Sequence, residues 1–159
     1  MLEIKNLTVK VKNNAPILTD VSLSIDEGTC IGLTGASGSG KTTLIKSIMG
    51  MNGGDLEIPQ GQILLDGDNL LTHSAKERRM LCGETIGFIP QNPMTAFFPH
   101  AKMERQIIET LRMHTGLDKK QAHALAENVL RKVNLTDTKR VLSAYPGELS
   151  GGMLQRIAM

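Results

Sequence analysis

The stretch Gly35-Ala36-Ser37-Gly38-Ser39-Gly40-Lys41-Thr42 decides the fold of this chain. It matches the pattern G-x-x-x-x-G-K-[ST] at every fixed position. A short apolar run precedes it at residues 29–34, and residues 42–50 have the pattern of a helix. A strand, a glycine-rich loop and a helix in this order are the context in which the pattern binds phosphate. The alternative is an accidental match in a flexible turn, which the two flanking elements disfavour.

The chemistry of such a loop follows from its backbone. Glycines let the chain curl until several N–H groups point at one anion, and the next helix brings the positive end of its dipole to the same point. Lys41 adds a positive charge for the β- and γ-phosphates, and the Thr42 hydroxyl is a ligand for Mg²⁺. We therefore expect a nucleotide to be bound by Gly35, Ala36, Ser37, Gly38, Ser39, Gly40, Lys41, Thr42 and Thr43.

The composition indicates about one domain with an aliphatic core. Of the 159 residues 40% are apolar, and there is no Trp. The net charge of +2 is too small to indicate a nucleic-acid partner. Two distant cysteines without metal-type spacing favour a reduced, cytosolic compartment, and Cys30 is expected to lie in the core. The aromatic residues are Phe88, Phe97, Phe98 and Tyr145.

Alternating apolar residues predict antiparallel strands in the first part of the chain. Residues 2–11 alternate with one slip near Asn6, and residues 17–25 alternate again after a turn. Three further strands are predicted at residues 29–34, 62–67 and 85–89.

Helical periodicity dominates the later part. Ser74 and Glu77 have the spacing of a capping box for a short helix that ends near residue 80. Residues 101–115 have one apolar face and end at Gly116, and a longer apolar stripe begins after Asp118. Both stripes are interpreted as core faces.

A second motif lies near the end of the chain. Leu149-Ser150-Gly151-Gly152-Met153-Leu154-Gln155-Arg156 places a hydroxyl and two glycines at the start of a helix, where an anion can bind. Between the two motifs, Gln91 follows a predicted strand. Alone, each of these later features is common. Together, they resemble the Walker A loop, the Q-loop glutamine and the LSGGQ signature of ABC-type ATPases, with Met153 in place of the usual glutamine.

This resemblance implies an α/β fold with a RecA-like P-loop core, an N-terminal antiparallel β subdomain and a helical subdomain, incomplete at the C-terminus. It assigns residues 1–91 to the β subdomain and partial core, 92–150 to the Q-loop and helical subdomain, and 149–159 to the signature and the following helix.

The resemblance also implies roles for individual residues. ATP and Mg²⁺ are the expected cofactors, with Lys41 and Gln91 in catalytic roles and Thr42 and Gln91 near the metal. A head-to-tail pair of subunits is implied, either identical or different, in which each signature contacts the partner's ATP. The signature residues are Ser150, Gly151, Gly152 and Met153.

A finer resemblance concerns importers of oligopeptides, dipeptides and nickel. The stretch Gln91 to Pro99 is similar to their Q-[DN]-P-x-x-[SA]-[LF]-N-P segment, except that Phe98 replaces the asparagine. Tyr145-Pro146 before the signature also fits this group. The implied partners are transmembrane permease subunits and, indirectly, an extracytoplasmic substrate-binding protein, which would place the chain at the cytoplasmic face of the membrane. Phe97 and Phe98 are expected to contact the permease, the alternative being that both rings pack inside.

Two family features are missing from the 159 residues. The Walker B strand, with its metal-binding aspartate and general-base glutamate, should follow the signature, so we expect a longer intact ATPase subunit and little hydrolysis by residues 1–159 alone. An aromatic residue for adenine is absent before Phe88, which leaves Val11, Ile17 or Lys12 as candidates to pack on the base.

Three other functions remain open at this stage. A non-transport ABC-type ATPase acting on DNA or ribosomes usually carries longer insertions than residues 91–150 provide. A small P-loop kinase or GTPase would leave the second motif unexplained. The third possibility is a nucleotide-binding module without turnover.

Overall fold

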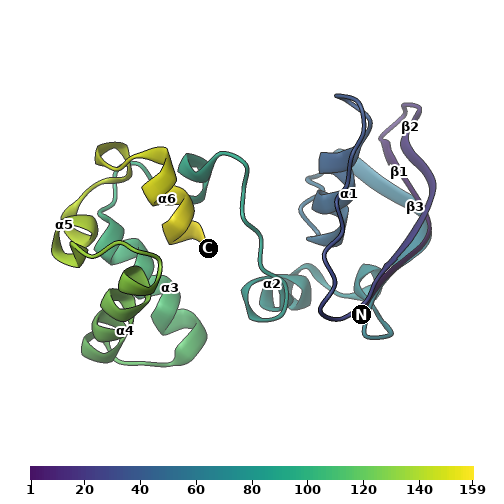
Figure 1. Cartoon of the computed structure of the whole chain (residues 1–159). Coiled ribbons are helices and arrows are strands. Elements are labelled where there is room, and N and C mark those ends of the chain that lie inside the picture. The colour runs from purple at the N-terminus through teal and green to yellow at the C-terminus, as the bar shows by residue number, and fades with distance from the viewer. The chain divides into compact units, whose positions relative to one another are not determined.

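A computed structural model describes the backbone of residues 1–159 and every side chain except that of Arg79. The chain forms two compact units, Met1–Ile86 and Gly87–Met159 (Figure 1). Each unit is described by itself below as the first and the second unit.

The first unit is built on a four-stranded antiparallel sheet. Its strands are β1 (Leu2–Val11), β2 (Pro16–Ile25), β3 (Leu56–Leu65) and β4 (Asp68–Asn69), in the order β2-β1-β3-β4. The predicted strands at residues 2–11 and 17–25 are therefore present, and the strand predicted at 62–67 is the end of a longer one. A left-handed turn at Asp66 and Gly67 joins β3 to β4.

The slip in alternation near Asn6 corresponds to an irregularity in the β1–β2 ladder. Asn6 has a φ of 49°, and the register shifts between Ile4 and Leu7. The Asn6 side chain donates a 2.8 Å hydrogen bond to Asp20 Oδ1, which holds the irregularity in place. Opposite it, Gly61 has a φ of 109°, and a Cβ there would lie 2.5 Å from Leu7 Cα. The bulge turns the apolar side chains of both halves of β1 to the same face.

Helix α1 (Lys41–Ile48) covers part of this core, followed later by the short helix η1 (Leu70–Thr72) and by α2 (Ala75–Glu84). The capping box predicted for α2 is present: Glu77 N–H donates to Ser74 Oγ, and Ser74 N–H donates to Glu77 Oε2. These hydrogen bonds with Ser74 lower the pKa of the Glu77 carboxyl. The buried core of the unit consists of Ile4, Leu7, Val9, Leu18, Leu44, Ile63 and Leu70.

Two predicted strands are wrong. Residues 29–34 join no ladder of the described chain; Ile31 and Leu33 are 50% and 46% exposed, and Cys30 is exposed rather than in the core. Of residues 85–89, only Ile86 pairs, in an isolated bridge to Cys82. Apolar composition shows that a segment can enter a sheet, but a ladder also needs a neighbouring strand to satisfy its backbone.

The second unit is entirely helical in its regular structure. Its elements are η2 (Pro93–Ala96), α3 (Met103–Thr115), α4 (Lys119–Lys132), α5 (Thr138–Ser143), η3 (Pro146–Glu148) and α6 (Gly151–Ala158). The predicted helix ends are confirmed: Gly116 ends α3 in a left-handed conformation, and Asp118 caps α4 through a 2.8 Å bond from Gln121 N–H.

The core of the second unit joins α3, α4, α5 and α6. Met103 is fully buried and its N–H donates to Ala144 O at 2.9 Å, which fixes the start of α3 against the segment after α5. Most apolar positions predicted for α3 and α4 are buried or pack against this core, but Val129 of the α4 stripe is 44% exposed. Its buried members are Met103, Ala126, Leu130, Leu135, Val141, Leu142, Ala144, Leu149 and Leu154.

Candidate nucleotide-binding site

The loop before α1 ends at a glycine that the packing requires. Gly40 precedes the first turn of α1 with φ 90° and ψ 4°. A Cβ at this position would lie 2.5 Å from Leu18 Cδ2 and 3.3 Å from Ile17 O. The backbone of Gly40 therefore lies directly against β2, which aims the N-terminus of α1 back at residues 35–39.

Lys41 places its ammonium group inside the loop. Its Nζ donates hydrogen bonds to the carbonyl oxygens of Gly35 at 2.8 Å and Ala36 at 2.6 Å, and to Ser39 Oγ at 3.3 Å. An ammonium group among carbonyl oxygens is a positive charge held where the backbone curls. A phosphate oxygen entering the loop would meet this charge directly.

The N-termini of α1 and α3 have no side-chain cap, whereas Ser74, Asp118, Asp137 and Ser150 cap α2, α4, α5 and α6; only α1 of the two uncapped helices follows the glycine-rich loop. The first N–H groups of α1 have no acceptor within the helix, so an anion can take the place of a cap.

The other candidate residues of the loop lie at its surface. Ala36, Ser37 and Gly38 are exposed, and a Cβ on Gly38 would meet no atom within 4 Å. The Thr42 hydroxyl is exposed and hydrogen-bonds to no residue in the described part of the chain, which leaves it free as an oxygen ligand. Thr43 is half-buried, and its carbonyl accepts from Ser47 Oγ at 2.8 Å within α1.

The second motif begins helix α6. Ser150 Oγ accepts from Met153 N–H at 3.3 Å and so caps the helix. Gly151 and Gly152 are exposed with φ angles outside the left-handed region, and a Cβ on either would meet no atom within 4 Å. The fold of this unit therefore does not require glycine at these two positions. Small residues there suit the close approach of something from outside the unit.

Gln91 is exposed and lies just before η2. The loop that carries it is ordered by its neighbour Asn92, whose side chain accepts from Met94 N–H at 3.1 Å and whose carbonyl accepts from Thr95 Oγ1 at 2.7 Å. Thus the Walker A candidates gather in the first unit, while Gln91 and the signature candidates lie in the second.

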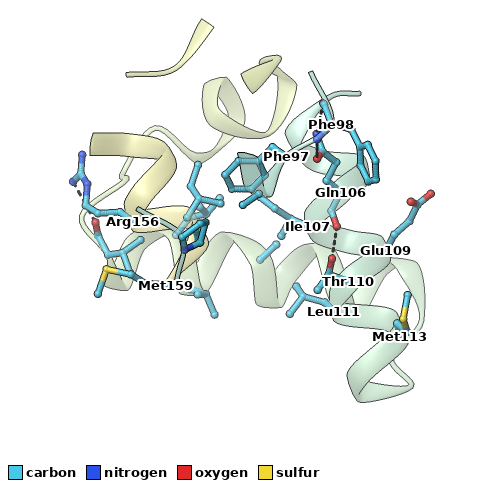
Figure 2. A pocket seen from close by; sticks show the side chains of 18 of the residues that line it. Phe97, Phe98, Gln106, Ile107, Glu109, Thr110, Leu111, Met113, Arg156 and Met159 are labelled. Carbon is cyan, nitrogen blue, oxygen red and sulfur yellow. Dashed lines mark hydrogen bonds between the residues drawn. The ribbon is translucent and has the colours of Figure 1, made fainter. Parts of the chain in front are cut away.

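The second unit also contains a cavity of about 590 Å³ between η2, α3, α4 and α6 (Figure 2). Most of its lining is apolar. The two adjacent phenylalanines behave differently: Phe97 packs against the buried core, whereas Phe98 is 76% exposed. Of the two residues expected to contact the permease, only Phe98 is exposed, and the alternative that both rings pack inside is wrong for Phe98.

Two residues with structural roles at this cavity carried no signal in the sequence. Arg156 donates to the carbonyls of Val133 and Asn134, both at 3.3 Å, and joins α6 to the end of α4. Gln106 hydrogen-bonds to the loop that carries Phe98. Each is a polar residue on an amphipathic helix, where a contact with a loop cannot be distinguished from a solvated position.

The geometry agrees with the result of a family comparison. Residues 18–159 match the ABC transporter family, so the chain belongs to that family. This family consists of P-loop proteins that form ATP-binding cassettes.

Three curated relatives are similar to nearly the whole chain. It is 34% identical over 158 residues to the metal-staphylopine import system ATP-binding protein CntD of Staphylococcus aureus (strain Mu50), covering 99% of this chain and 58% of that protein. It is 36% identical to the dipeptide transport ATP-binding protein DppD of Lactococcus lactis, covering 98% and 46%, and 33% identical to the oligopeptide transport ATP-binding protein OppD of Haemophilus influenzae, covering 99% and 49%. The chain thus spans about half the length of these relatives.

Solved structures support the fold. A dimeric bacterial ABC transporter cassette aligns with a TM-score of 0.82 and 24% identity over 99% of this chain and 67% of that one. A post-hydrolysis cassette bound to ADP and Pi aligns with a TM-score of 0.80, 25% identity and the same coverage. The ABC cassette fold with a P-loop core, an antiparallel β subdomain and a helical subdomain is therefore shown, and the chain covers about two thirds of it.

Proposed function

We propose that this chain is the nucleotide-binding part of an ATPase subunit that drives uptake of peptides or metal chelates. The observation that carries the proposal is the Lys41 ammonium group, which is held inside a glycine-rich loop. The helix that follows this loop, α1, has no side-chain cap. The import systems named among the relatives support the substrate class. Hydrolysis is assigned to the complete subunit, since residues 1–159 offer no carboxylate placed as a general base by the family pattern.

ATP would bind by replacing the hydrogen-bond acceptors of Lys41 with its own phosphate oxygens. The ammonium group now hydrogen-bonds to Gly35 O and Ala36 O, and phosphate oxygens would replace these carbonyls. The free N–H groups of α1 would bind the same phosphates. Mg²⁺, which neutralises developing charge on the phosphates, would be held by the exposed hydroxyl of Thr42. Of the three candidates for adenine, Ile17 lies beside Gly40 and is the best placed.

Ser150, Gly151, Gly152 and Met153 would meet the ATP of a second subunit. The support is steric: both glycines open onto free space, so their role lies outside their own unit. A contact between this signature and the ATP of a second subunit is compatible with both a homodimer and a heterodimer.

The membrane partner would dock on the second unit, beside the cavity of Figure 2. The exposed Phe98 ring supports this, because a large apolar side chain in water is stabilised when a partner covers it. None of the helices in the described residues combines the length and the hydropathy needed to cross a bilayer. The chain would attach to permease subunits at the cytoplasmic face as a peripheral subunit, and a substrate-binding protein would act through the permease.

The first experiment compares Mg-ATP binding and turnover by residues 1–159 and by the complete subunit. Lys41→Ala should abolish binding in both, whereas Lys46→Ala, which removes an exposed lysine from the last turn of the same helix, should not. Turnover should appear only in the complete subunit.

Comparable turnover by residues 1–159 would require a general base that has not been identified and would reopen the proposal. Binding by both proteins without turnover by either would favour the second candidate, a nucleotide-binding module that does not hydrolyse ATP.

A further inference from the structure

Phe98 is held in an exposed position by a specific contact. Its ring is 76% exposed although Phe97, next to it, packs on the core. The ring lies in the connection between η2 and α3. A free loop would let an apolar ring of this size turn toward the core, so something must hold the backbone.

The restraint is the side-chain amide of Gln106, on α3. Its Oε1 accepts from Phe98 N–H at 2.8 Å, and its Nε2 donates to Phe98 O at 3.1 Å (Figure 2). The same Nε2 donates to Ala101 O at 2.8 Å. One amide thus contacts both backbone polar groups of Phe98 and a third group three residues later, in addition to the backbone bond from Ala101 N–H to Phe98 O at 3.2 Å. Only a side chain with an acceptor and two donors at its end can do this, which excludes glutamate.

The base of this contact is rigid. Helix α3 begins at Met103, which is fully buried and hydrogen-bonded to Ala144 O. One turn beyond Gln106, Thr110 Oγ1 donates to the Gln106 carbonyl at 2.8 Å. The loop is therefore fastened to a helix whose first residue is buried in the core of the second unit.

We propose that Gln106 is a positioning residue that holds Phe98 outward as a preorganised anchor for the membrane subunit. This inference rests on the proposed docking function. A ring already fixed in its bound position avoids the ordering cost that a flexible loop would incur on association. Gln106 itself need not touch the partner.

The test measures the affinity of the complete subunit for its membrane subunits in detergent, with amide hydrogen exchange at residue 98 as a second readout. Phe98→Ala should weaken binding by about tenfold or more, as for buried aromatic anchors. Gln106→Ala should weaken it by a comparable factor and speed exchange at residue 98. Gln106→Glu should do the same, since its second oxygen would face the carbonyls of Phe98 and Ala101.

A control variant and a double variant test whether Gln106 acts through Phe98 or independently of it. Gln121→Ala removes a glutamine that also hydrogen-bonds to a loop, through Asp118 N–H, and should change neither readout. If Gln106 acts only through Phe98, the double variant should bind as Phe98→Ala does.

The inference would be overturned if the double variant lost affinity by the product of the two single-variant factors, or if Gln106→Ala bound with full affinity. Either result would leave the docking function intact. Full affinity in Phe98→Ala would refute the docking function, and the inference with it.

Discussion

The substitution Gly40→Ala should destabilise the first unit far more than Gly38→Ala, although both glycines belong to the same loop. Both have positive φ, 90° and 81°, so each alanine would carry the backbone strain of a left-handed residue, about 1–2 kcal/mol. They differ in their surroundings, because a Cβ on Gly38 meets nothing within 4 Å and a Cβ on Gly40 meets Leu18 Cδ2 at 2.5 Å.

The extra cost at Gly40 comes from the core. Leu18 is only 7% exposed, so its methyl group cannot turn away without disturbing Leu44 and its neighbours. Overpacking of this kind costs about 1–3 kcal/mol, which adds to the strain for a total of about 2–5 kcal/mol.

Urea unfolding followed by a probe in the first unit measures both changes. The m-value should stay constant, so that shifts in midpoint report stability. Equal destabilisation by Gly40→Ala and Gly38→Ala would refute the argument, because it would mean that the loop does not lie against β2. A Leu18→Ala background, in which the clash is removed, should reduce the difference between the two variants.

Three further predictions concern other parts of the chain. The Glu77 pKa is lowered in the folded state, so the ionised carboxyl stabilises α2 fully above the ordinary pKa of 4.5, and this stabilisation is lost as the pH falls through the folded pKa. Amide exchange in α2 should become faster over that pH range, and Ser74→Ala should abolish this pH dependence. Met103→Ala should cost about 2–5 kcal/mol, measured as unfolding of the second unit. Gly152→Ala should leave the melting temperature unchanged, because the added methyl group meets no atom, but should prevent ATP-dependent dimerisation in sedimentation; a large drop in melting temperature would contradict this.

Much of the fold follows from local signals in the sequence. The capping box at Ser74 and the helix boundary at Asp118 each depend on residues within a few positions of one another. The irregularity at Asn6 is visible as a local slip in the alternation, although Asp20 on β2 holds it in place. The phosphate loop belongs to the same class, since Gly40 and Lys41 lie at fixed spacing in a continuous stretch. Local patterns of this kind need no knowledge of the rest of the structure.

What could not be predicted depends on contacts between distant segments. The run at residues 29–34 is apolar enough for a strand but has no ladder partner in the described chain. The different burial of Phe97 and Phe98 is set by Gln106, eight residues after Phe98, on another element. Helix α5 was not predicted either, because its six residues are too few to show a period.

The internal hydrogen bonds of Lys41 make ligand capture an exchange rather than a simple addition. Three acceptors, two of them carbonyls, must be given up before the ammonium group can serve an incoming anion. A ligand with few oxygens would return less than it displaces, since each lost hydrogen bond to a charged group is worth about 1.5–3 kcal/mol. These hydrogen bonds of Lys41 therefore disfavour small, weakly charged anions and favour a polyphosphate chain, which brings enough oxygens to replace all three acceptors.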